Sequence, residues 1–163
     1  MEKKFNYQIK DLEILISRKF EAELAAVWDA FTDCHILDQW WAPKPWICHT
    51  KSQEFKVSGR WLYAMKGPND EIHWSFFDYE SIEPKNYFSG KDGFCDENGQ
   101  LLPGQQSSEW KISFKSLHGI CTMTSHCIYP NEKTKNMMVE MGFLEGFEIG
   151  LNQLENLLKT SAS

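Results

Sequence analysis

The sequence predicts a single α+β domain in which a curved antiparallel sheet and a long C-terminal helix enclose an apolar pocket. Two patterns predict this fold. Apolar residues alternate over residues 12–20 and again over much of 47–129, which is typical of strands. From Met137 to Leu158 they recur every three or four positions, which is typical of one long amphipathic helix. The absence of repeats and linkers favours one domain over residues 1–163.

The chain opens with a predicted strand and two predicted short helices. Alternation of apolar residues places the strand at residues 12–20. Residues 22–31 then change to helical spacing. Asp33 is a suitable N-cap for a second short helix over residues 34–40, and Pro43 lies just beyond its end.

Residues 47–129 predict an antiparallel meander, which brings the sheet to about six or seven strands. Turn signals at Ser58–Gly59, at residues 67–70 and at residues 84–86 divide it. The polar, glycine-containing segment 92–106 predicts a long mobile connection between two strands.

Three glycines form a strip on the predicted long helix. Gly142, Gly146 and Gly150 are four residues apart, so they would share one face. Each costs about 1 kcal/mol relative to alanine inside a helix. One interpretation is close packing of the helix against the sheet. The alternative is that the strip makes room for a ligand between helix and sheet.

Charge and composition exclude several classes of partner. The net charge of −6 repels phosphate backbones, and the sequence has no cluster of Lys and Arg that would attract them locally. We therefore expect no nucleic-acid binding. No apolar run reaches the roughly 18 residues of a membrane span, and no signal peptide is evident. Five cysteines without Cys-x-x-Cys spacing fit free thiols and a cytoplasmic location.

The aromatic content indicates an apolar pocket. Aromatic residues make up 14% of the chain, with seven Trp and eleven Phe. The alternative is that these side chains only fill the core. The candidate ligand-binding residues are Trp40, Trp41, Trp61, Tyr63, Met65, Trp74, Phe76, Trp110, Met123, Phe143, Gly146 and Phe147.

Candidate catalytic residues are weaker. His73 with Asp78 or Glu80 would supply acid–base chemistry if the side chains converged in the pocket. No motif for nucleophilic catalysis, phosphate binding or dinucleotide binding is present, so we expect no cofactor and favour a protein without catalytic activity. Cysteine and histidine are adjacent in the pairs Cys48–His49 and His126–Cys127. Adjacent side chains of a strand point to opposite faces, so neither pair can bind one metal ion easily and we expect no metal site.

Several motifs together resemble a known family. Residues 27–33 read VWDAFTD and residues 37–43 read LDQWWAP; residues 54–61 and 142–147 also match. This order resembles the family named for the C-terminal domain of the Hsp90 ATPase activator, in the START-like superfamily with the Bet v 1 allergens and polyketide cyclases. The resemblance implies the helix-grip fold and a cavity between sheet and long helix. Ala42 replaces the glycine that usually follows the paired tryptophans.

Three functions therefore compete. The first is binding of a small hydrophobic or aromatic molecule without chemistry. The second is a cyclase- or hydrolase-like enzyme that uses the pocket histidine and carboxylates. The third, implied by the family name, is a chaperone partner of Hsp90 type or a stress-response role. The tryptophans around Trp41 and Trp46 also make a homodimer an open alternative.

Overall fold

The computed structural model describes residues 4–161, which contain eight strands and four helices. In chain order these are β1 (Phe5–Lys10), β2 (Glu13–Phe20), α1 (Leu24–Thr32), α2 (Cys34–Trp40), β3 (Ile47–Gln53), β4 (Arg60–Lys66), β5 (Ile72–Glu83), β6 (Tyr87–Cys95), β7 (Ser108–Leu117), β8 (Ile120–Ile128), α3 (Glu132–Glu140) and α4 (Phe143–Ser161).

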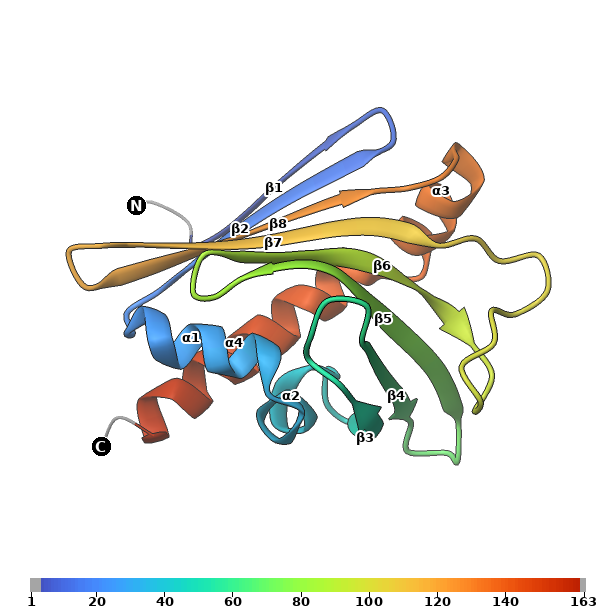
Figure 1. Cartoon of the computed structure of the whole chain (residues 1–163), viewed down its shortest axis with the longest axis horizontal. Coiled ribbons are helices and arrows are strands. Elements are labelled where there is room, and N and C mark those ends of the chain that lie inside the picture. Colours follow the sequence, from blue (N-terminus) through green and yellow to red (C-terminus); the bar gives the residue numbers. More distant parts are fainter. Residues whose placement is uncertain (1–3, 162–163) are drawn as a thin grey trace.

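All eight strands form one open antiparallel sheet in the order β1-β2-β8-β7-β6-β5-β4-β3. The sheet curves over α4, and α1 and α2 lie on the same side (Figure 1). The apolar core fills the space between that concave face and the helices. The α+β class with an antiparallel sheet and a C-terminal helix is therefore confirmed.

The predicted number of six or seven strands is wrong, because β1 was missed. Five of its six side chains are exposed, so it shows no apolar alternation. It is held at the sheet edge by backbone pairing, with Phe5 opposite Arg18 and Lys10 opposite Glu13. Periodicity reports burial of side chains, so an edge strand that packs only Phe5 against the core leaves no such pattern.

The prediction of one continuous C-terminal helix is also wrong. Gly142 has a φ of +86°, a left-handed conformation that ends α3 and separates it from α4. The helix α3 buries none of its side chains, whereas Leu151 and Leu154 of α4 are fully buried. The apolar spacing therefore continues across a break in the backbone.

The segment after residue 92 is more ordered than the sequence predicts. The strand β6 continues to Cys95 instead of ending near residue 91. The following turn is held by Asp96, whose Oδ1 accepts from the backbone N–H groups of Asn98 and Gln100. Arg60 adds a hydrogen bond of 2.5 Å to the carbonyl oxygen of Gly99.

The predicted bounds of the second short helix, residues 34–40, and its N-cap at Asp33 are confirmed by α2. The side chain of Asp33 accepts the backbone N–H of His35 at 2.9 Å. Trp40, at the end of α2, is 1% exposed and donates from Nε1 to the carbonyl oxygen of Ala30 at 2.9 Å. Its ring also contacts Phe31 edge-on, so Trp40 fixes α2 against α1.

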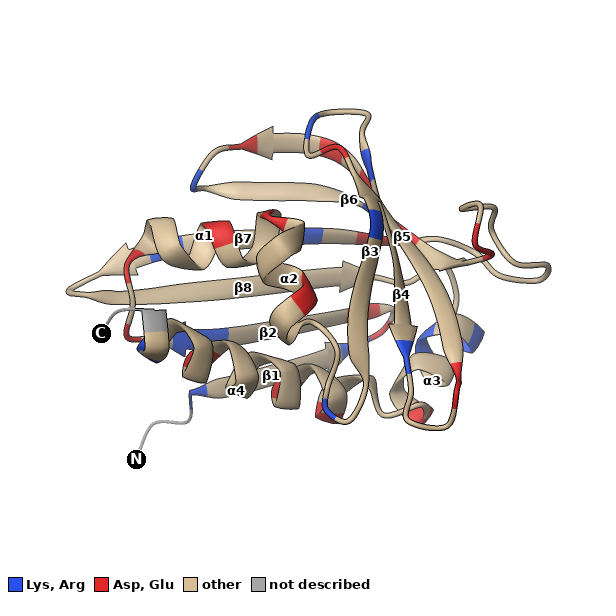
Figure 2. Cartoon of the chain, turned by 90° about the horizontal axis from the view of Figure 1, so that it is seen from below, with Lys and Arg blue, Asp and Glu red and all other residues tan. Residues whose placement is uncertain are grey.

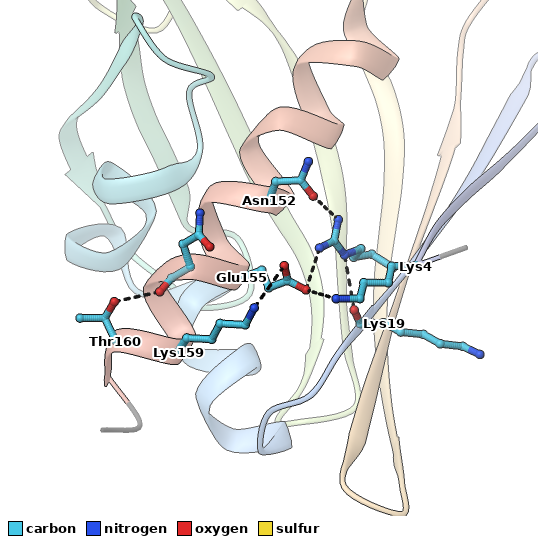
Figure 3. Close-up of polar contacts among 8 residues, drawn as sticks. Lys4, Lys19, Asn152, Glu155, Lys159 and Thr160 are labelled. Carbon is cyan, nitrogen blue, oxygen red and sulfur yellow. Dashed lines mark hydrogen bonds and ion pairs between the residues drawn. The ribbon is translucent and has the colours of Figure 1, made fainter. Parts of the chain in front are cut away.

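A buried arginine attaches α4 to the sheet. Arg18 of β2 is only 2% exposed. Its Nη1 donates a hydrogen bond to Asn152 Oδ1 at 2.6 Å, and its Nη2 lies 3.2 Å from Glu155 Oε1 in an ion pair. Glu155 also pairs with Lys4 and Lys159 (Figure 3). The hydrogen bond from Lys4, with the charge of Arg18, holds the pKa of Glu155 below its usual range.

The glycine strip serves packing against the end of α2, not against the sheet. A β-carbon added at Gly146 would lie 3.6 Å from Pro43 Cγ. At Gly150 it would lie 3.2 Å from the carbonyl oxygen of Trp40 and 3.4 Å from that of Trp41. Gly146 and Gly150 therefore let α4 approach the backbone at and after the end of α2, whereas Gly142 lies at the break before α4 and has no contact with that segment.

Alanine substitutions at the three glycines are expected to have different effects. Gly146→Ala meets only ordinary contacts, so it should stabilise the protein by about 0.5–1 kcal/mol through helix propensity. Gly142→Ala should destabilise it by about 1 kcal/mol because of the positive φ. Gly150→Ala should be less favourable than Gly146→Ala. Urea unfolding measures all three, and equal effects would contradict this packing.

Candidate functional site

A small cavity lies between the concave face of the sheet and the α1–α2 segment. Its volume is about 20 Å³, room for about one water molecule, whereas pockets for drug-sized ligands measure about 300–1,000 Å³. The sequence predicts a pocket between the sheet and the long C-terminal helix, but no residue of α4 lines this cavity. The lining residues are Phe31, Leu37, Trp41, Trp61, Tyr63, Phe77, Tyr79, Phe88, Asp92, Trp110 and Ile112.

Asp92 of β6 is the one charged group in this otherwise apolar or aromatic lining. Burial raises the pKa of its carboxyl from 3.8 to about 7, because the low-dielectric surroundings disfavour the ionised form. The Trp110 indole and the Asp92 backbone N–H lower the pKa only in part. No Lys, Arg or His is among the lining residues, so the carboxylate has no cation beside it within the described structure.

The Trp110 indole lies beside Asp92 in the cavity lining. Among the described residues, Trp110 Nε1, Ser125 Oγ and Tyr129 Oη are buried without a hydrogen bond of normal distance and angle. Trp110 itself lines the cavity and lies opposite Cys127 in the β7–β8 register.

Trp41 covers the cavity from the end of α2. Its Nε1 donates to the hydroxyl of Tyr63 at 3.1 Å. Its ring contacts Trp61 and Phe147 edge-on at centroid distances of 5.5 and 5.8 Å. Unlike Trp40, it is only partly buried. Trp41 is therefore the lining side chain that lies between the cavity and the surface of the α2 segment.

The structure brings only part of the predicted ligand-binding set to the cavity. Trp41, Trp61, Tyr63 and Trp110 line it. Phe143 and Phe147 stack on each other and contact Trp110 without lining the cavity. The remaining members of the set on this side of the sheet lie elsewhere: Trp40 and Met123 in the core, Met65 packed against it, and Gly146 near Pro43.

Trp74 and Phe76 lie on the opposite face of the sheet. Directly paired residues share a face, and β5 pairs Phe76 with Leu62 and Phe77 with Trp61. Phe76 therefore belongs to a separate cluster with Leu62 and Cys95, against which Trp74 packs. The predicted assignment of Trp74 and Phe76 to the inner face of β5 is therefore wrong, and Phe77 and Tyr79 occupy that face.

The predicted catalytic residues do not converge. His73 is exposed and stacks on Trp46. Asp78 faces away from the cavity and binds Arg60 in a bidentate pair with distances of 2.6 and 2.9 Å. Glu80 is exposed at the irregularity between β5 and β6. None of the three lines the cavity, so acid–base chemistry there would need another group.

The only group of potential metal ligands within residues 4–161 is Asp33, Cys34 and His35. These consecutive residues bring ligand atoms within 4.8 Å, but the Asp33 carboxylate already caps α2. His126, from a pair considered above, instead contacts Glu13 at 2.6 Å. We therefore build no metal site from these residues.

Charge is spread over the molecule. On the side that carries the helices, Lys and Arg lie scattered among Asp and Glu without gathering on one element (Figure 2). This distribution matches the net charge of −6 and provides no basic surface there for a phosphate backbone. None of the helices in the described part of the chain has the length and hydropathy needed to cross a membrane.

Asp92 is the functional candidate that the sequence analysis missed. The sequence predicts a mobile connection over residues 92–106, because glycine and aspartate are typical of turns. Gly90 and Gly93 instead lie inside β6, and a β-carbon at Gly90 would overlap the carbonyl oxygen of Asp78. The signal available was the pair Phe94–Cys95, since apolar residues continue the strand beyond Asp92.

The fold and the closed apolar interior define a helix-grip protein, in which an open antiparallel sheet wraps around a C-terminal helix. Residues 21–159 match the family described as Activator of Hsp90 ATPase homolog 1-like protein. The chain belongs to this family, consistent with the START-like superfamily.

Solved structures share the fold over almost the whole chain. A protein from Arthrobacter aurescens is 25% identical, with a TM-score of 0.88 and coverage of 95% of this chain and 91% of that one. A Staphylococcus epidermidis protein is 25% identical, with a TM-score of 0.85 and coverage of 95% and 94%. A Mycobacterium smegmatis protein is 23% identical, with a TM-score of 0.86 and coverage of 98% of both chains. A comparison with curated proteins found no match.

Proposed function

We propose that the protein binds a small hydrophobic or aromatic molecule in the cavity between the sheet and the α1–α2 segment. The observation that carries the proposal is an aromatic cavity that contains a desolvated carboxyl group with no cation among the lining residues. A desolvated carboxyl group without a cation beside it costs stability, and such groups cluster at functional sites.

Binding requires the cavity to open. Its 20 Å³ is too small for an aromatic ring, since even benzene needs an apolar cavity of about 150 Å³. Trp41 is the side chain whose displacement would open it, because it is partly buried and is held by one side-chain hydrogen bond, to Tyr63. The ligand therefore replaces the Trp41 indole over Trp61 and Tyr63.

The Trp41→Ala variant tests this function. Removing the indole eliminates the cost of breaking its hydrogen bond and ring contacts, so the variant should bind indole at least about tenfold more tightly than the wild type. Isothermal titration calorimetry measures the affinity. Trp46→Ala is the matched control, because Trp46 stacks on the exposed His73 and does not line the cavity.

Two results decide the proposal. Saturable binding of indole by Trp41→Ala, with the wild-type affinity retained in Trp46→Ala, supports it. If neither the wild type nor Trp41→Ala binds indole, 2-phenylethanol or phenethylamine at millimolar concentration, the cavity is only a packing defect. Circular dichroism of Trp41→Ala verifies that the variant is folded.

A further inference from the structure

We infer that the ligand carries a protonated amine, which the Asp92 carboxylate binds while the surrounding rings hold the apolar part. This inference rests on the proposed function and names the chemical class of its ligand. It follows from the lining of the cavity, which contains the carboxyl group of Asp92 and no Lys, Arg or His.

The cavity offers one negative charge and no positive one. The other titratable groups that interact with Asp92 are Tyr63 from β4, Cys127 from β8, and Tyr129, which directly follows β8. All three are neutral when protonated, and burial raises the pKa of each, so none supplies a cation. From the helical side, Phe31, Leu37 and Trp41 contribute only apolar or indole groups.

The rings beside Asp92 favour the same charge. Trp41, Trp61, Tyr63 and Trp110 line the cavity together, and aromatic faces attract cations through their quadrupole. Desolvation strengthens this attraction. An ammonium group would therefore be held by both the carboxylate and the ring faces.

Other polar classes fit less well. A carboxylic acid would place a second negative charge beside Asp92 in a low-dielectric interior, which is strongly unfavourable. A neutral alcohol can donate one hydrogen bond to Asp92 but leaves its charge uncompensated. The cavity thus discriminates against anionic lipids and acids as well as favouring amines.

Three ligands of similar shape test the inference: phenethylamine, 2-phenylethanol and phenylacetate. Calorimetry at pH 8 should show the amine bound at least about tenfold more tightly than the alcohol, and phenylacetate bound most weakly. The Asp92→Asn variant should lose the preference for the amine but should still bind the alcohol. The same series in the Trp41→Ala background keeps the comparison measurable where the closed wild-type cavity binds weakly.

Proton linkage provides a second measurement. Because an ammonium ion requires ionised Asp92, amine binding near pH 7 should release protons, detectable as a dependence of the heat on buffer ionisation enthalpy. Asp92→Asn should lose this release. Equal binding of amine and alcohol, or unchanged selectivity in Asp92→Asn, would overturn the inference and leave the proposed function intact. No binding of any ligand in either background would instead remove the proposed function itself.

Discussion

Replacing Asp92 by asparagine is expected to stabilise the protein by up to about 4 kcal/mol at pH 8 and to change little near pH 4. The folded-state pKa is raised from 3.8 to about 7 by burial. Each pKa unit corresponds to about 1.36 kcal/mol, so the ionised carboxyl destabilises the folded state by up to roughly 4 kcal/mol once both states are ionised.

The direction of the pH dependence follows from proton binding. Between about pH 4 and pH 7 the unfolded chain has lost the Asp92 proton and the folded protein still holds it. The unfolded state then binds fewer protons, so stability falls as pH rises through this window. Asp92→Asn removes this part of the slope.

Urea unfolding at several pH values measures this effect. Glu80→Gln is the matched control, because it removes the same formal charge from an exposed position outside the cavity. A constant difference in unfolding free energy between Asp92→Asn and wild type from pH 4 to pH 8 would contradict the burial of an uncompensated carboxyl group.

Truncating Trp40 to alanine is expected to destabilise the protein by about 3–5 kcal/mol, the usual cost for a buried tryptophan. Its ring packs on Phe31 and Trp41, and its N–H satisfies the buried carbonyl of Ala30. The substitution therefore removes apolar packing and leaves an acceptor unpaired, and it also loosens the contact between α2 and Gly150.

Two variants separate these contributions. Trp40→Phe retains one aromatic ring but loses the hydrogen bond and part of the buried ring surface, so it should cost less than the alanine variant. Trp46→Ala, at a half-buried tryptophan in the same segment, should cost less than half as much. Chemical denaturation compares all three. A smaller loss for Trp40→Ala than for Trp46→Ala would show that α2 is not anchored through Trp40.

Much of the fold could be predicted because most elements bury one face. The spacing of Trp110, Ile112 and Phe114 marked β7, and Asp33 marked the start of α2. β1 could not be found this way, since its exposed side chains carry no pattern. The break at Gly142 was also hidden, because apolar spacing is unaffected by a single left-handed residue.

The site was predicted less completely than the fold. Trp61 and Tyr63 were assigned to the inner face of β4, and both line the cavity. On β5 both alternating sets are aromatic, so the sequence could not distinguish Trp74 and Phe76 from Phe77 and Tyr79. Asp92 was missed because a polar residue between glycines is typical of a turn. Only the register with Phe77 places it on the inner face.

The pairing of β2 with β8 has a consequence for how the chain folds. Glu13 of β2 pairs with Ile128 of β8, so the N-terminal hairpin joins the rest of the sheet through strands that lie far apart in the sequence. Contacts of such sequence separation slow folding, because the loop entropy is lost before the contact forms. During synthesis the first hairpin must wait until β8 has been made. Arg18 then gains Asn152 and Glu155 as partners only when the final helix arrives.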